Sequence, residues 1–224
     1  MEEHKKPIVV PWDFTHVAGH ALAHAVKISR MVGNDICLLH IVDSGINSKI
    51  MSEKKVLLQK LTEENSIKYN VTITYHISKG SIFTAIAEFA NDKEASLVVM
   101  GTHGMKGMQK LTGSWALKVI VKSKIPFIVI QDPPADQERY HNIVFPVDFR
   151  GENKQKIKMA IFMGKFFESK VHMLVSVSTD KTIIKKTNIN LNYAIKYLIQ
   201  NNIDYEIHEM PKGNIAEQTL DFAQ

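Results

Sequence analysis

The chain has 224 residues, of which 45% are hydrophobic and 23% charged, and its formal net charge is +5. This length suits one large domain or two small ones, with the composition of an ordinary soluble protein. No run approaches the ~20 apolar residues of a membrane span, and no basic block is interleaved with aromatic residues as in nucleic-acid-binding proteins. A single cysteine, Cys37, excludes an internal disulfide. With no signal-peptide pattern at the start, these features predict a cytoplasmic protein.

Short apolar strand patterns alternate with amphipathic helix patterns through residue 131. Strands are expected at Ile8–Pro11, Asp35–Val42, Val71–Ser78, Leu97–Met100 and Pro126–Ile130. Helices are expected at about Val17–Val32, Ile50–Tyr69, Ile82–Asn91 and Trp115–Lys122. This order predicts an α/β fold with an open parallel five-stranded sheet and helices on both faces. In the second helix, Ile50, Leu57 and Leu61 stand at helical spacing, as do Glu64 and Lys68.

Three histidines, His16, His20 and His24, follow one another at four-residue spacing on the polar face of the first helix. Such spacing can hold a transition metal. The simpler interpretation is a solvated stripe, and we predict no metal site here. His40 and Cys37 lie in an apolar strand pattern, and both are expected to be buried core residues.

Glycines punctuate the segment between the fourth strand and the last helix, at Gly101, Gly104, Gly107 and Gly113, and Ser114 is a good N-cap. The start of a helix attracts anions because its first N–H groups are unpaired and the helix dipole is positive there. Glycines let backbone N–H groups approach phosphate oxygens closely. The loop therefore predicts a phosphate or nucleotide cradle, with glycines that serve only tight turns as the alternative.

Asp13 directly follows the first strand, where α/β sheets place their ligands. Alternatively, Asp13 or Thr15 caps the next helix. The order Gly101-Thr102-His103-Gly104 and then Gly113-Ser114, with Pro11, Asp13 and Phe14 upstream, resembles the universal stress protein family. ATP-binding members carry glycine, two residues, glycine, nine residues, glycine, then serine or threonine. Here only the eight residues 105–112 separate Gly104 from Gly113.

The resemblance implies a Rossmann-like fold similar to that of the adenine nucleotide alpha hydrolases, and a site for ATP accompanied by Mg²⁺. Asp13 and Ile41 would hold the adenosine, and the glycine loop would hold the phosphates. The implied nucleotide-binding residues are Pro11, Asp13, Ile41, Met100, Gly101, Gly104, Gly113, Ser114 and Trp115.

A polar segment with prolines, residues 132–140, is expected to be a linker. Beyond it Ile143–Phe149 repeats Ile8–Phe14, with Asp148 in place of Asp13. The strand-helix pattern restarts with this repeat. Further strands are expected at Lys170–Val177 and Asp204–Met210, and helices at about Lys154–Phe167 and Leu191–Asn201 and around Thr219–Gln224. We therefore expect a complete universal stress protein domain at residues 1–131. An incomplete second copy at residues 141–224 would lack the glycine loop and last strand, as in a truncated tandem protein.

The sequence offers no strong pairing of a nucleophile with a base, so no catalytic residue is predicted. At most, slow hydrolysis of ATP is expected. The favoured function is an adenine-nucleotide-binding module in stress response. The alternative is a dimeric regulatory module that binds no nucleotide, its pocket closed by the shortened loop with Met105, Met108 and Trp115. In either case the resemblance implies a homodimer paired through Pro126–Ile130.

Overall fold

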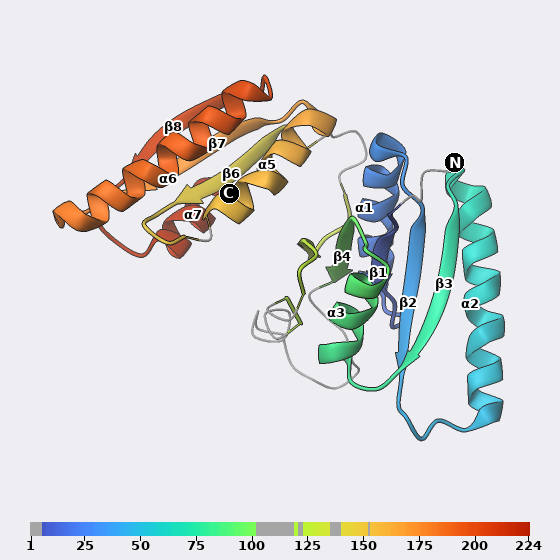
Figure 1. Cartoon of the computed structure of the whole chain (residues 1–224). Helices are drawn as coiled ribbons and strands as arrows, with labels where there is room; N and C mark the ends of the chain where they lie inside the picture. Colours follow the sequence, from blue (N-terminus) through green and yellow to red (C-terminus); the bar gives the residue numbers. More distant parts are fainter. Residues whose placement is uncertain (1–5, 102–118, 121–122, 135–139, 152) are drawn as a thin grey trace. The chain divides into compact units, whose positions relative to one another are not determined.

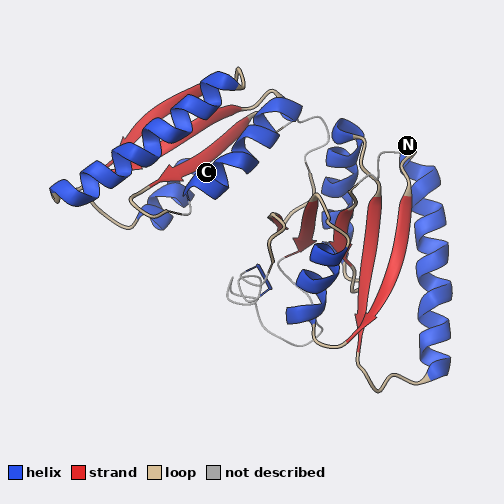
Figure 2. Cartoon of the chain, in the orientation of Figure 1, coloured by secondary structure: helices blue, strands red, loops and turns tan. Residues whose placement is uncertain are grey.

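The computed structural model describes residues 6–101, 119–120, 123–134, 140–151 and 153–224. The chain divides into two compact units, Met1–Ala135 and Asp136–Gln224. Strands and helices alternate in both (Figures 1 and 2).

The first unit contains a five-stranded sheet in which every pair of neighbours is parallel. Its strands are β1 (Ile8–Pro11), β2 (Ile36–Val42), β3 (Ile73–Lys79), β4 (Leu97–Gly101) and β5 (Phe127–Ile130). Their order is β3-β2-β1-β4-β5. The predicted sheet is therefore confirmed, because each apolar run forms a strand within two residues of its expected bounds.

Helices connect successive strands of this sheet: α1 (His16–Val32), α2 (Ser48–Tyr69) and α3 (Ile82–Asp92). The side chains of Thr15, Asn47 and Ser81 accept the first amide hydrogen bonds of these helices, as N-caps do. Right-handed crossovers from β1 to β2 to β3 place α1 and α2 on one face, and the return from β3 to β4 places α3 on the other. Of the expected helix Trp115–Lys122, only Val119 and Ile120 lie within the described residues, and both are helical.

One core of the first unit lies under α3. Buried residues of that helix pack on alternate residues of the central strands, namely Ile86, Phe89 and Ala90 against Val9, Cys37, Leu39 and Val98. The helix expected at about Ile50–Tyr69 is α2, in which Ile50 and Leu57 are exposed and Leu58 and Thr62 are the buried residues. Apolar residues on several sides of α2 made its periodicity ambiguous, because Val56, Leu57 and Leu58 are consecutive.

The second unit begins the same pattern again. It has β6 (Asn142–Val147), β7 (Lys170–Ser176) and β8 (Tyr205–Met210), which form a parallel three-stranded sheet in the order β6-β7-β8. Its helices are α5 (Asn153–Phe167), α6 (Lys181–Gln200) and α7 (Ile215–Ala223). A three-stranded sheet of this order fits the predicted incomplete second copy.

Helix α6 starts ten residues earlier than the sequence pattern indicated, at Lys181 rather than Leu191. Asp180 caps it by accepting hydrogen bonds from the amides of Thr182 and Ile183. The earlier turns were missed because two of their buried positions are polar, Thr187 and Asn190. Asn190 donates to the carbonyls of Asp148 and Arg150 at 2.7 and 2.9 Å, which satisfies its buried amide.

The faces of the second sheet follow from its core. Val171, Met173 and Val175 of β7 pack with residues of α5 and α6. Successive residues of a strand point to opposite faces, so His172 and Leu174 belong to the other face, where Phe222 of α7 lies beside His172. Within the described residues, no helix combines the length and apolarity that a membrane crossing requires.

Candidate functional site

The carboxyl ends of β1 and β4 define the candidate site of the first unit. These neighbouring strands are reached by chain connections that run in opposite directions, from β1 toward β2 and from β3 back to β4. Parallel sheets bind ligands outside the strand ends at this kind of reversal, because the two connections diverge and leave a crevice. Asp13 follows β1, and Gly101 is the last residue of β4.

Asp13 is exposed just beyond β1, and its carboxylate organises the start of α1. Its Oδ1 atom accepts hydrogen bonds from the amide and the hydroxyl of Thr15, at 3.0 and 2.6 Å. Thr15 in turn caps α1 by accepting from the amide of Ala18 at 3.3 Å. Asp13 can therefore support the helix start and bind a ligand at the same time. Both hydrogen bonds from Thr15 end on Oδ1, and among the described residues Oδ2 has no hydrogen-bond partner.

Phe14 has a backbone conformation that is unusual for an aromatic residue, with φ of 63° in the left-handed region. Such a conformation costs about 1–3 kcal/mol and persists where surrounding contacts hold it. The Phe14 ring meets His40 and Trp12 edge-on, with centroids 5.0 and 6.3 Å apart. The Nζ atom of Lys54, on α2, lies 4.5 Å from the Phe14 ring centroid. These contacts fix the turn that presents Asp13.

His40 is the buried partner in this cluster, as the sequence predicted. Its Nδ1 atom lies 2.7 Å from the carbonyl oxygen of Trp12, which ties the end of β1 to β2. Burial lowers the pKa of His40, and the Lys54 charge lowers it further, while the Trp12 carbonyl and Asp13 act in the opposite direction. The neutral imidazole therefore serves as a structural link behind the Asp13 turn.

Gly101 has a packing reason to be glycine. A Cβ atom at this position would lie 2.5 Å from Cγ1 of Val17 and 3.3 Å from the Val17 carbonyl oxygen. The end of β4, where the glycine loop starts, thus lies against the first turn of α1. This contact was not anticipated from the sequence, because it depends on the strand order that brings β4 beside β1.

The other predicted site residues within the described part of the chain lie at the same edge of the sheet. Pro11 pairs with Leu39 at the end of β1, and Ile41 is the penultimate residue of β2. Met100, half-buried, pairs with Val129 of β5. The predicted residues Gly104, Gly113, Ser114 and Trp115 lie outside the described residues, as do Met105 and Met108 of the alternative interpretation.

The three histidines of α1 were expected to be solvated, but the structure buries one of them and places another against the chain after β5. His24 is buried, and its Nε2 atom lies 3.1 Å from the carbonyl oxygen of Asp132. His20 approaches the carbonyl oxygen of Gln131 at 3.4 Å, and the rings of His16 and His20 pack edge-on. The chain after β5 covers this side of α1, a long-range contact that helical periodicity does not reveal.

Asp148, which repeats Asp13 in the second unit, has a different environment. It is buried, and its carboxylate accepts hydrogen bonds from the Arg150 amide at 2.9 Å and Arg150 Nε at 2.6 Å. The Arg150 Nη2 atom lies 2.5 Å from the same carboxylate. This carboxylate is therefore already neutralised by a neighbouring side chain, unlike the exposed Asp13.

Comparison with known proteins agrees with these features. Two curated universal stress proteins of Methanocaldococcus jannaschii are similar: one is 28% identical over 57% of this chain and 83% of its own length, and the other is 27% identical over 56% and 94%. A crystal structure of a universal stress protein from Archaeoglobus fulgidus DSM 4304 is 15% identical. It matches 99% of this chain and 83% of its own with a TM-score of 0.76, a likeness of fold. The family model described as the universal stress protein family matches residues 5–131, and the chain belongs to this family.

Proposed function

We propose that the first unit binds ATP or a related adenine nucleotide at the carboxyl ends of β1, β2 and β4, and acts as a cytoplasmic regulator in stress response. Asp13 and Ile41 hold the adenosine. The segment from Gly101 through Gly104 and Gly113 to Ser114 holds the phosphates, with Mg²⁺ arriving on the phosphate oxygens rather than through a protein cage. Pro11, Met100 and Trp115 border the nucleotide.

The observation that carries the proposal is the exposed carboxylate of Asp13 at the strand reversal beside the start of the glycine loop. A carboxylate accepts hydrogen bonds from the hydroxyls of a ribose, and Oδ2 is available for this while Oδ1 bonds Thr15. The first turn of α1 adjoins Gly101 and carries no acidic residue. Its positive end therefore favours phosphate groups on the loop that follows β4.

Calorimetric titration of the whole chain with Mg²⁺-ATP tests the proposal. Asp13→Ala removes the carboxylate, and the loss of a hydrogen bond to a charged group, about 1.5–3 kcal/mol, weakens binding by about 10- to 100-fold. Gly113→Val places a bulky side chain in the glycine loop and weakens binding as well. Asp35→Asn is the matched control, since it removes one charge just before β2, at the opposite edge of the sheet.

A second variant separates binding from folding. Asp13→Asn keeps an oxygen that can accept from Thr15, so α1 stays capped while the charge is lost. Weakened binding with unchanged thermal unfolding in this variant supports a direct contact with the nucleotide. Absence of binding by the intact chain overturns the proposal and favours a dimeric regulator that uses no nucleotide. For that quaternary structure we propose that β5 of one chain pairs with β5 of a second copy, because β5 ends the sheet.

A further inference from the structure

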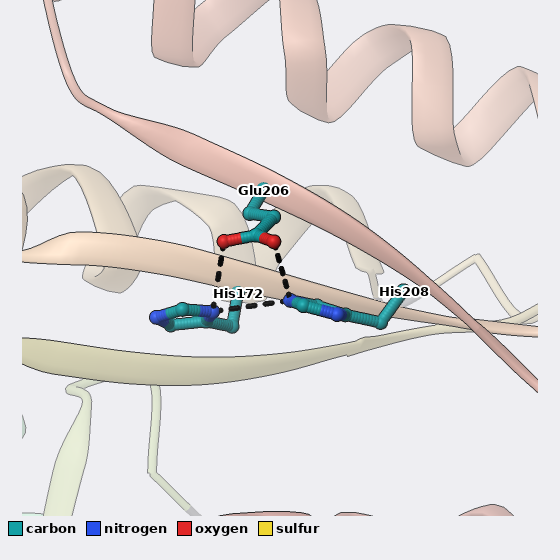
Figure 3. A group of neighbouring side chains, drawn as sticks. All are labelled: His172, Glu206 and His208. Carbon is teal, nitrogen blue, oxygen red and sulfur yellow. Dashed lines mark hydrogen bonds and ion pairs between the residues drawn. The ribbon is translucent and has the colours of Figure 1, made fainter.

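Three potential metal ligands gather on one face of the second sheet (Figure 3). His172 of β7 stands directly opposite Glu206 of β8 in the strand register. His208 lies two residues further along β8 and therefore points to the same face. This is the face of Phe222 on α7, whose ring centroid lies 4.7 Å from that of His208. The regular backbone of two paired strands thus places all three side chains on the same face of the sheet.

The facing atoms of the cluster are close together. Nδ1 of His172 lies 3.1 Å from Nε2 of His208. The carboxylate of Glu206 spans the pair, with Oε2 3.9 Å from His172 Nδ1 and Oε1 4.0 Å from His208 Nε2. All three ligand atoms lie within 4.8 Å of one another. In Figure 3 the carboxylate lies across the gap between the two rings.

A neighbouring residue orients His172 for ligation. Its outer nitrogen, Nε2, lies 3.1 Å from Oδ1 of Asn142. A carbonyl oxygen only accepts hydrogen bonds, so this contact favours the tautomer with the proton on Nε2. That tautomer leaves an unprotonated Nδ1 facing Glu206 and His208. Metal-bound histidines are commonly held in this way by a hydrogen bond from their other ring nitrogen.

We propose that His172, Glu206 and His208 form a site for a divalent transition metal, with Zn²⁺ as the best fit. Two imidazoles and one carboxylate are ligands that zinc accepts, and a three-residue set leaves a fourth position for water. With Zn–N distances of about 2.0–2.1 Å, neighbouring ligands of a tetrahedral site lie about 3.3 Å apart. The nitrogen pair is already near this spacing. Glu206 is half-exposed, with 48% of its side chain accessible, so it can close the remaining gap by a rotamer change.

Lys170 is the competitor for this site. Its Nζ atom lies 2.7 Å from Oε2 of Glu206, and its positive charge disfavours a cation beside it. Both side chains are about half exposed, and such surface ion pairs contribute only about 0–1 kcal/mol. A dication that takes two imidazoles and the carboxylate can therefore displace the lysine. Without metal, the same residues form a His–His hydrogen bond and a Lys–Glu ion pair.

The corresponding positions of the first unit do not carry this ligand set. The registers Val9↔Cys37 and Val144↔His172 place Cys37 where the second unit has His172. Thr74 pairs with Cys37 as Glu206 pairs with His172. His76 stacks on Phe89 with centroids 4.6 Å apart, as His208 packs near Phe222. The carboxylate and one imidazole are therefore particular to the second unit, and the inference does not depend on nucleotide binding.

Calorimetric titration of the chelator-treated whole chain with Zn²⁺, without nucleotide, tests the site. We expect one Zn²⁺ per chain at this site. His172→Asn and Glu206→Gln each remove a ligand and weaken binding by more than about tenfold, since even second-shell changes cost that much. Lys170→Met removes the competing cation and tightens binding, a gain that misfolding cannot produce. His76→Asn, at the position equivalent to His208, is the matched control and leaves binding unchanged.

The histidines on α1 are the alternative location for a bound metal. Their spacing allows a two-histidine contact with a metal, so the double change His16→Asn and His20→Asn is measured beside the others. Zn²⁺ binding that is lost in this double variant and kept in His172→Asn overturns the proposal. No Zn²⁺ binding by the intact chain overturns it as well. Co²⁺ in place of Zn²⁺ gives an independent readout, because its visible absorption reports a four-coordinate site.

Discussion

Replacement of Gly101 by alanine tests the tight contact between β4 and α1 at the edge of the proposed site. The new methyl group would lie 2.5 Å from Cγ1 of Val17, whereas carbon atoms rest at about 3.5–4.0 Å. About 1 Å of relief is needed, and Val17 cannot easily supply it because its χ1 is restricted within a helix. Overpacking of this kind costs about 1–3 kcal/mol. We therefore expect Gly101→Ala to lower the melting temperature of the first unit by a few degrees.

Tryptophan fluorescence during urea or thermal unfolding measures this effect selectively, because both tryptophans, Trp12 and Trp115, belong to the first unit. Gly19→Ala is the matched control: its added Cβ meets nothing within 4 Å, and alanine in a helix interior gains about 0.5–1 kcal/mol over glycine. In a Val17→Ala background the cost of Gly101→Ala should shrink by about 1 kcal/mol. An equal cost in both backgrounds, or none at all, would refute the packing argument and leave ligand approach as the reason for the glycine.

Two further predictions concern pH and assembly. Burial lowers the pKa of His40 below its ordinary value, so the unfolded chain binds more protons. The contribution of neutral His40 to the free energy of unfolding is therefore fully present above the unfolded pKa of about 6.5. It declines as the pH falls through that value, by at most about 1.4 kcal/mol per pH unit for one proton. His40→Asn, which keeps an N–H for the Trp12 carbonyl, should make this decline shallower in denaturant unfolding between pH 7.5 and 5.5, because buried His24 still contributes its share; an unchanged slope would contradict the assignment. For assembly, light scattering should give twice the 25.4 kDa chain mass. Val129→Lys, on the exposed surface of β5, should give one chain mass because an edge charge opposes strand pairing; a monomeric parent chain would refute this dimer.

Strand positions were predictable because strands buried on both faces read as short continuous apolar runs, as Ile8–Pro11 and Leu97–Gly101 do. Helices with strong caps and one clear apolar face were equally readable, as Ser81 and α3 illustrate. Periodicity failed where polar side chains are buried and satisfied by distant partners. Asn190 is the example, because its hydrogen bonds to residues 148 and 150 depend on the fold of the whole unit.

The candidate sites divide in a similar way. Asp13, Ile41 and Gly101 were predictable as residues at strand ends, and the strand order then sets β1 between β2 and β4. The group of His172, Glu206 and His208 was missed, although Glu206 and His208 are two residues apart on β8 and therefore share a face. Only the register between β7 and β8 places His172 opposite Glu206. The first unit shows the same register, since Cys37 pairs with Thr74 as His172 pairs with Glu206, and such pairings follow from the folded sheet rather than from the sequence.

The central claim is that the first unit holds one adenine nucleotide at the carboxyl edge of its sheet. Amide chemical shifts of the isotope-labelled whole chain, followed by NMR as Mg²⁺-ATP is added, test it most directly. The account predicts saturable shifts concentrated at Asp13, Ile41, Gly101 and Gly113, with little change around Asp148 and Arg150. Shifts confined to the second unit, or to the opposite edge of the first sheet near Asp35, would contradict it.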